Sequence, residues 1–242
     1  MKLKKFIVPF TGDKRMIYAK EYLENHGFEH TGNSENADFV LLPVPVKEDM
    51  FKGFEDKILF YGMGNRKNGF DYMQYESFVL KNAFLTAEGA VTLIEENTAY
   101  SLYRAEILII GYGRIGKALH NILKGYGADI TVCSRSKSSK DEAIFNGAKH
   151  ISFEQLKSEN NANIIFNTVP HMVLTKNELS ALKKDAVILD LASFPGGVDT
   201  LVADSLGLAV LNGRKMPSRY TEKTAGYLIG EAVSDIIEEE LT

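Results

Sequence analysis

Three glycines between an apolar segment and an amphipathic one are the clearest chemical signal in this sequence. They lie in the run GYGRIG at 111–116, directly after the apolar residues 107–110. In such a loop the first glycine allows a tight turn, the second lets the backbone approach a pyrophosphate, and the third lets a helix pack closely on the strand. The helix then presents free N–H groups to the phosphates. The run predicts dinucleotide binding, rather than a purely structural turn, through Gly111, Gly113, Arg114, Ile115 and Gly116.

A second group of side chains follows the next predicted strand, about 20 residues further on. At this position an NAD-binding site carries an Asp or Glu that binds the ribose 2′-hydroxyl. This sequence has Ser134, Arg135 and Ser136 instead, a guanidinium between two hydroxyls. These groups suit a 2′-phosphate, which a carboxylate would repel. The sequence therefore predicts NADP rather than NAD; the alternative is that Arg135 is only a solvated loop cation.

A third group ends the fourth predicted strand of the same region. It consists of Asn167, Thr168, Val169 and Pro170. Ligands of open parallel sheets bind at the carboxyl edge, so we expect these residues to contact the nicotinamide half of the cofactor. His171 follows them, and because histidine changes its charge near neutral pH, this residue is either a proton carrier or a solvated loop side chain.

The elements that position these groups alternate between short apolar segments and segments of helical periodicity. This alternation predicts an α/β protein with helices packed on a parallel sheet. Six strands form a Rossmann doubly wound sheet. They are predicted at 106–111, 129–134, 149–151, 163–168, 186–191 and 208–211. A smaller N-terminal α/β domain has predicted strands at 6–10, 39–43 and 57–61 and a helix at 14–25.

We divide the chain into four predicted segments. They are an N-terminal domain for substrate or partner at 1–85, a connecting helix capped by Thr86 at 86–105, the dinucleotide-binding domain at 106–221 and an amphipathic helix at 222–242. The last helix carries apolar residues on one face at helical spacing. Because it follows the last strand, it either crosses back to pack on the N-terminal domain or covers the nucleotide domain alone.

The composition excludes several classes of protein. The chain of 242 residues has 28 Lys and Arg against 32 Asp and Glu, a net charge of −4, which provides no general basic surface for nucleic acid or anionic lipid. The single cysteine, Cys133, cannot form an internal disulfide, and no metal-ligand spacing is visible. No apolar stretch approaches the ~18 uncharged residues of a membrane span, and the first apolar run is too short for a secretory signal. We expect a cytoplasmic protein that binds no metal, nucleic acid or membrane.

The order of the motifs resembles that of the A-type subunits of dipicolinate synthase, a family related to the D-2-hydroxyacid dehydrogenases. The motifs that carry the resemblance lie at 12–15, 86–90, 111–116, 134–136, 167–170, 189–199 and 223–226. The resemblance covers nearly the whole chain, is strongest from Thr86 to Gly226 and is thin between Gly27 and Lys81. The Ser-Phe-Pro-Gly-Gly run and the Lys-Thr-Ala-Gly run are its more specific parts.

The resemblance implies an NADP-dependent oxidation of dihydrodipicolinate, or of its hydrated precursor, to dipicolinate in the mother cell of a spore-forming bacterium. It also implies that the partner is the flavoprotein-like B-type subunit of dipicolinate synthase, and a homo-oligomer is compatible with it. Because such a small dicarboxylate is a dianion, we expect cations and hydrogen-bond donors at an interdomain cleft. The candidate catalytic residues are Lys223, Glu88, Asp13 and Arg15. Lys223 is the first choice to bind a carboxylate or accept a proton, and a surface or capping role is the alternative for each.

The chain departs from the family pattern at two places. Phe194 stands where some members are expected to carry a basic residue, and the residues at 218–222 differ from the usual approach to Lys223. An ordinary D-2-hydroxyacid dehydrogenase would have an arginine in place of Phe194 and a catalytic histidine in place of Lys223. Two alternatives therefore stay open: a dehydrogenase of another small carboxylic acid, and a non-catalytic dinucleotide sensor or scaffold.

Overall fold

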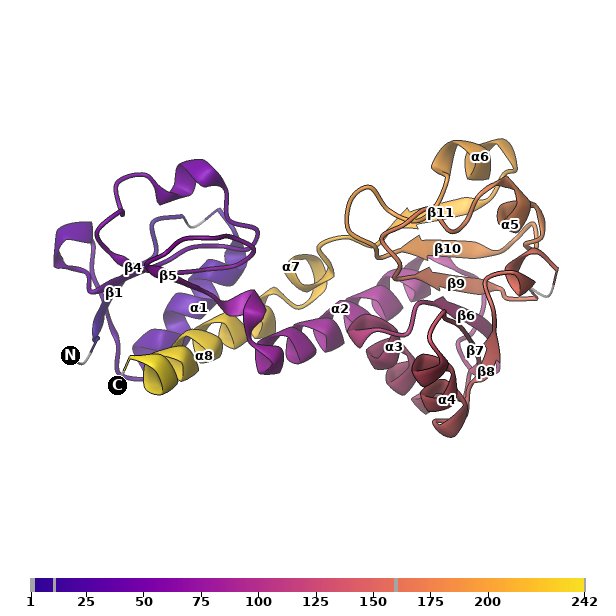
Figure 1. Cartoon of the computed structure of the whole chain (residues 1–242), viewed down its shortest axis with the longest axis horizontal. Coiled ribbons are helices and arrows are strands. Elements are labelled where there is room, and N and C mark those ends of the chain that lie inside the picture. The colour runs from indigo at the N-terminus through magenta and orange to yellow at the C-terminus, as the bar shows by residue number, and fades with distance from the viewer. Residues whose placement is uncertain (1–2, 11, 159–160, 242) are drawn as a thin grey trace. The chain divides into compact units, whose positions relative to one another are not determined.

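The computed structural model describes residues 3–10, 12–158 and 161–241 and divides the chain into two compact units (Figure 1). The first unit is Met1–Asn82 with Pro217–Thr242, and the second is Ala83–Met216. The chain passes from one unit to the other within α2 (Glu76–Asn97) and returns at the start of α7 (Met216–Tyr220). The first unit is therefore built from two separate pieces of sequence.

The second unit contains a parallel sheet with the strand order β11-β10-β9-β6-β7-β8. Its strands are β6 (Glu106–Ile110), β7 (Asp129–Cys133), β8 (Lys149–Ile151), β9 (Ile164–Asn167), β10 (Val187–Asp190) and β11 (Ala209–Asn212). This is the order of a dinucleotide-binding fold, and it reverses between β6 and β9. The predicted Rossmann sheet is thus confirmed, and each predicted strand agrees with the observed one to within one residue at each end.

Helices connect these strands and cover the sheet. They are α3 (Arg114–Gly125), α4 (Lys137–Phe145), α5 (Lys176–Ser180), α6 (Thr200–Ser205) and the short 3-10 helix η4 (Gln155–Lys157). One face of the sheet is sealed by a core in which Leu108, Ile165 and Ile188 pack with Leu179 and Ala203 from α5 and α6. These strands are apolar on both faces because helices cover a parallel sheet from both sides.

The first unit contains a second parallel sheet, with the order β2-β1-β3-β4-β5. Its strands are β1 (Lys5–Ile7), β2 (Glu29–His30), β3 (Phe39–Leu41), β4 (Ile58–Tyr61) and β5 (Gly69–Asp71). The 3-10 turns η1 (Ser34–Asn36), η2 (Glu48–Phe51) and η3 (Tyr72–Gln74) lie in its connections. The predicted strands β1 and β3 end early, before Pro9 and Pro43, because proline cannot donate to a ladder. The sequence did not predict β2 and β5, which are too short to show a period.

The C-terminal helix α8 (Glu222–Glu240) packs against α1 (Lys14–Asn25) in the first unit. Its residues Ile229, Val233 and Ile236 join the core formed by Met16 and Leu23 of α1 and the sheet. The return of this helix to the N-terminal domain, one of the two alternatives left open by the sequence, is therefore confirmed.

The predicted connecting helix is wrong at both ends. Helix α2 begins at Glu76, so Thr86 lies inside the helix rather than at its N-cap, and the helix ends at Asn97 rather than at residue 105. Thr86 was misread because threonine is common both at helix starts and within helices, whereas the apolar periodicity continues upstream to Phe78. The two units divide at Asn82, inside this helix, rather than at residue 85.

Helix α2 also has the length and hydropathy of a membrane-spanning segment. Half of its most apolar window is buried inside the protein, and core helices of soluble proteins share these properties. Its hydropathy therefore reflects packing within the fold as readily as contact with lipid.

Candidate dinucleotide-binding site

The glycine loop joins β6 to α3, and each of its three positions favours glycine for a different steric reason. Gly111 has a φ of +94°, a conformation that side chains rarely adopt. A Cβ on Gly116 would lie 2.3 Å from the carbonyl oxygen of Gly111, so the helix could not pack as closely on the turn. Gly113 is the N-cap of α3, and a Cβ there would meet nothing within 4 Å. The space beside Gly113 is thus open on the side where a phosphate would approach the helix N-terminus.

The side chain of Thr168, which follows β9, supports the glycine loop. Thr168 donates its hydroxyl to the carbonyl of Ile110 over 2.9 Å, and a Cβ on Gly111 would lie 2.3 Å from the same hydroxyl oxygen. Thr168 therefore supports the turn, and its predicted contact with the nicotinamide half of the cofactor stays a prediction. Arg114 and Ile115 open α3, with Arg114 exposed and Ile115 half-buried.

Tyr112 and His120 form a buried pair beside the loop. The sequence did not predict this pair. The Tyr112 hydroxyl lies 2.6 Å from His120 Nδ1, and only 1 % of His120 is exposed. Burial, together with the charge of Lys124, lowers the pKa of His120, so the ring is held neutral. This contact ties the loop to α3 and could not be read from the sequence, since the two residues lie eight positions apart on different elements.

Ser134, Arg135 and Ser136 line a pocket of about 590 Å³ at the carboxyl end of β7. Lys137, Lys140, Asp141, His150, Ser152 and Gln155 complete its wall. Cations thus outnumber carboxylates in the lining, which favours a negatively charged ligand. Ser134 is buried and its Oγ lies 3.0 Å from His150 Nε2, whereas Ser136 caps α4 by accepting the Ser139 N–H.

Lys140 and His150 were not predicted as lining residues, because they come from α4 and β8 and not from the end of β7. Nothing local in the sequence marks them. The register of the sheet places His150 opposite Val132, two residues before Ser134. Only strand pairing brings these side chains to one pocket.

Asn167 ends β9 and is fully buried. Its amide donates to Asp190 Oδ1 over 2.7 Å and to the carbonyl of Val169 over 3.1 Å, and its side-chain oxygen accepts the Val169 N–H. Asp190 in turn accepts the N–H groups of Ala192 and Gly197. Asn167 therefore fixes the loops after β9 and β10, and its predicted contact with the cofactor stays a prediction. Val169 is half-buried, and Pro170 and His171 are exposed.

A guanidinium lies beside Phe194, where the resemblance led us to expect a basic residue. Arg214 follows β11 and donates to the carbonyls of Ala192 and Pro195, in each case over 3.1 Å. Its guanidinium carbon is 5.9 Å from the centre of the exposed Phe194 ring. The chain thus supplies a cation here from another strand.

Two of the four predicted catalytic residues, Asp13 and Arg15, meet in the first unit. Asp13 caps α1, and its carboxylate accepts two hydrogen bonds from Arg15 Nε and one of 2.6 Å from Arg15 Nη2. The same guanidinium nitrogen donates to the carbonyl of Val44, in the loop after β3, over 2.6 Å. The pair therefore lies at the carboxyl ends of β1 and β3, where the strand order of this sheet reverses.

Lys223 and Glu88, the other two, are both exposed and belong to different units. Lys223 is on the first turn of α8, with its ammonium 5.8 Å from the ring of Tyr18 and 5.4 Å from that of Tyr227. Glu88 lies in the second unit, inside α2, and therefore not at the helix start predicted for it. The gathering of all four residues at one cleft stays a prediction.

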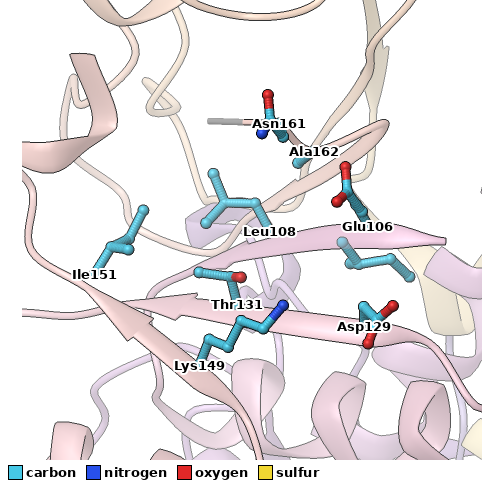
Figure 2. A pocket seen from close by; sticks show the side chains of 9 residues that line it. Glu106, Leu108, Asp129, Thr131, Lys149, Ile151, Asn161 and Ala162 are labelled. Atoms are coloured by element: carbon cyan, nitrogen blue, oxygen red, sulfur yellow. The ribbon is translucent and has the colours of Figure 1, made fainter. Parts of the chain in front are cut away.

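A second, more enclosed pocket of this unit lies far from the carboxyl edge. Figure 2 shows Glu106, Asp129 and Lys149, the first residues of β6, β7 and β8, around a cavity of about 230 Å³. It lies at the amino ends of the strands, opposite the edge where dinucleotides bind. Among the described residues, no group of three His, Cys, Asp or Glu side chains is placed to hold a metal ion.

Comparison with protein families identifies the domain that carries the glycine loop. Residues 75–193 match the NAD-binding domain of D-isomer specific 2-hydroxyacid dehydrogenases. The chain is 28 % identical over 165 residues to the A-type subunit of dipicolinate synthase from Bacillus subtilis, an alignment that covers 68 % of this chain and 56 % of that protein. It is also 34 % identical over 97 residues to a glyoxylate reductase of Thermococcus litoralis, covering 38 % of this chain and 28 % of the reductase. The chain thus spans little more than half the length of the Bacillus subtilis relative and less of the reductase.

Solved structures show the same architecture over the whole chain. The A-type subunit of dipicolinate synthase from Bacillus halodurans superposes with a TM-score of 0.86 at 20 % identity, covering 98 % of each chain. The protein from Bacillus subtilis has a TM-score of 0.84 at 22 % identity, covering 99 % of this chain and 97 % of the other. Residues 75–193 therefore resemble the NAD-binding domain of the 2-hydroxyacid dehydrogenases, which supports a nicotinamide dinucleotide as cofactor, and the predicted resemblance of the chain to the A-type subunits of dipicolinate synthase is confirmed in both sequence and fold.

Proposed function

We propose that this protein binds NADP at the carboxyl edge of the second sheet and uses it to oxidise dihydrodipicolinate, or its hydrated precursor, to dipicolinate. The observation that carries the proposal is the cationic pocket beside the glycine loop, with Arg135 in place of an acidic residue, in a chain similar to a dipicolinate synthase component. A 2′-phosphate adds negative charge at this point, and the pocket has the guanidinium and hydroxyl donors that bind it.

The proposed reaction removes a hydride and a proton from a dihydropyridine ring. NADP, when bound, accepts the hydride, and the proton passes to a side chain or to water, so the ring becomes aromatic. The product is more stable than the substrate, and the protein is therefore required mainly to orient the ring and to balance its two carboxylates. Gly113 and the first turn of α3 would hold the pyrophosphate, and Asn167 and Thr168 hold the loops that surround the reactive half.

Among the candidate catalytic residues, Lys223 and Arg15 provide the positive charge for a dicarboxylate. Arg15 already donates to Asp13 and Val44, so it is rigid and part of its charge is neutralised by Asp13. Lys223 is exposed and its ammonium faces two tyrosine rings, which leaves it accessible to an anion. We therefore keep Lys223 as the first candidate for carboxylate binding, and Glu88 as a candidate proton acceptor.

The proposal includes a second protein. The similar proteins are named as one component of a synthase that has more than one kind of subunit. We therefore propose that the flavoprotein-like B-type subunit of dipicolinate synthase is the partner of this chain. Both would work in the cytoplasm of the mother cell of a spore-forming bacterium.

One experiment tests cofactor and reaction separately. Calorimetric titration of the full chain with NADP and with NAD should give a lower Kd for NADP. The Arg135→Gln variant should bind NADP about 10- to 100-fold more weakly, the range expected for the loss of one charge-assisted hydrogen bond. Its Kd for NAD should be unchanged. Equal affinities of the wild type for NADP and NAD would contradict the proposed preference for NADP.

The reaction is then followed by the absorbance of reduced nicotinamide, with fresh dihydrodipicolinate and with and without the flavoprotein-like partner. We expect reduction of NADP that is lost in Lys223→Ala. A mixture that binds NADP and remains inert with the partner present would contradict the oxidation and favour the dinucleotide sensor.

A further inference from the structure

His150 and Ser134 form a contact in the cationic pocket that the reaction does not require. His150 is on β8 and half-buried, and its Nε2 lies 3.0 Å from the Oγ of Ser134, which is only 8 % exposed. Both line the pocket together with Arg135. The imidazole therefore lies one hydrogen bond away from a hydroxyl at the proposed phosphate position.

The protonation state of His150 decides what this hydroxyl can donate. A neutral ring with a bare Nε2 accepts the Ser134 proton, and the oxygen then offers only lone pairs to the pocket. A protonated ring donates from Nε2 to Ser134 Oγ, and the serine proton is released to donate to an anion. From the tautomer with the bare Nε2, protonation changes Ser134 into a donor toward the pocket and adds a positive charge behind it.

The surroundings of His150 disfavour its protonated form in the free protein. Burial first, and then the charge of Lys140, lower the pKa of His150 below its ordinary value, against a hydrogen bond with the backbone of Ser134 that raises it. The other charged groups in the pocket lining are Arg135 and Lys137, which are cations, and Asp141, which is an anion. A phosphate dianion bound among these cations would offset their effect and favour the protonated ring.

We infer that His150 is a positioning residue for the 2′-phosphate. As NADP binds, His150 takes up a proton and turns the Ser134 hydroxyl toward the phosphate. The inference rests on the proposed use of NADP. It predicts that the preference for NADP over NAD increases as the pH falls.

The sign and range of this dependence follow from linkage. A group whose pKa rises on binding takes up a proton, so NADP affinity grows as the pH falls from 8 toward about 6.5. The gain is at most about tenfold for each unit by which the phosphate raises the pKa of His150. Below about pH 6 the phosphate itself is protonated and the preference declines again.

The test measures the Kd of NADP and of NAD on the full chain by calorimetry from pH 8 to pH 6. The ratio of the Kd for NAD to the Kd for NADP reports the contribution of the 2′-phosphate alone, because the contributions of the glycine loop and of His120 are common to both cofactors. The wild type should show a preference for NADP that rises several-fold toward pH 6.5, by no more than about tenfold for each unit by which the pKa of His150 rises on binding. His150→Gln should keep its affinity for NAD and show a flat ratio over this interval.

Lys149→Gln is the matched control, because this neighbouring side chain lines the cavity at the amino ends of the strands instead (Figure 2). It should retain the wild-type rise. A flat ratio in a wild type that still prefers NADP would overturn the role of His150 and leave the NADP proposal standing. A rise that persists in His150→Gln would do the same, whereas equal affinity for both cofactors at every pH would overturn both proposals.

Discussion

At the scale of single residues, the glycine loop separates a requirement of the fold from a requirement of the ligand. Gly116 is needed because the carbonyl of Gly111 occupies the place of its Cβ. Gly113 has an ordinary negative φ and open space beside it, so the protein itself does not need a glycine there. A pyrophosphate that contacts the helix N-terminus supplies the missing reason.

This difference predicts opposite outcomes for two substitutions. Gly113→Val should leave the thermal midpoint nearly unchanged and weaken NADP and NAD alike by about tenfold or more, because the new methyl groups occupy the phosphate position. Gly116→Ala should destabilise the second unit by about 1–3 kcal/mol, because the backbone must move. Thermal unfolding and calorimetric titration separate the two.

Gly125→Ala serves as the control, since it ends the same helix and a Cβ there meets nothing within 4 Å. It should leave dinucleotide affinity unchanged and raise the thermal midpoint slightly, because alanine is the better helix former. Full dinucleotide affinity in a folded Gly113→Val protein would rule out the glycine loop as the phosphate site.

At the scale of elements, the contact between α1 and α8 holds the first unit together. The two helices approach closely because α8 carries glycines where it crosses α1. A Cβ on Gly226 would lie 2.4 Å from the carbonyl oxygen of Arg15, and one on Gly230 would lie 2.8 Å from side-chain atoms of Tyr22. The same crossing positions Lys223, one turn before Gly226, beside Tyr18.

We expect the two glycines of α8 to differ in tolerance. Gly226→Ala should lower the stability of the first unit by about 1–3 kcal/mol, because backbone cannot move aside without separating the helices. Gly230→Ala should cost less, because the Tyr22 side chain can rotate. Urea unfolding followed by circular dichroism measures both.

NADP affinity is the internal control for these two variants. It should not change, because the residues of the proposed dinucleotide site lie in the second unit. Equal losses in the two variants, or a greater loss in Gly230→Ala, would show that the contact with Arg15 does not limit the packing.

At the scale of the whole molecule, the chain consists of two units with separate cores and two crossings of the backbone. The only thiol in the sequence, Cys133, lies in the core of the second unit at the end of β7. Burial raises its pKa to about 12, so the native protein should not react with thiol reagents at pH 8. Its reaction rate therefore reports the opening of the second unit.

Bound NADP should protect the two units unequally. At a cofactor concentration of about 100 times Kd, the second unit gains about 2.7 kcal/mol, and labelling of Cys133 in mild denaturant should slow by about 100-fold. Hydrogen exchange of the amides in α1 and α8 should stay unchanged, because the first unit contains none of the proposed cofactor contacts. Equal protection of both units would instead show that cofactor binding couples them.

The sequence alone determined the local elements, and the proposed type of cofactor site also rests on it. Strands such as β6 and β7 were predictable because apolar runs bounded by turn residues specify a buried strand, and α1 was predicted with its observed bounds. The glycine spacing and the missing acid after β7 are likewise local, because one turn supplies the atoms that meet the phosphates.

Tertiary structure decided what depends on partners distant in the chain. It placed α8 on α1, buried the Asn167 amide against Asp190, and brought His150 beside Ser134. Periodicity says that a helix face or a strand end is apolar or polar, but not which surface it meets. Burial, pKa values and hydrogen-bond partners are set by those non-local contacts. They give Asn167 and Thr168 a part in holding the loops and place Thr86 inside a helix rather than at its start.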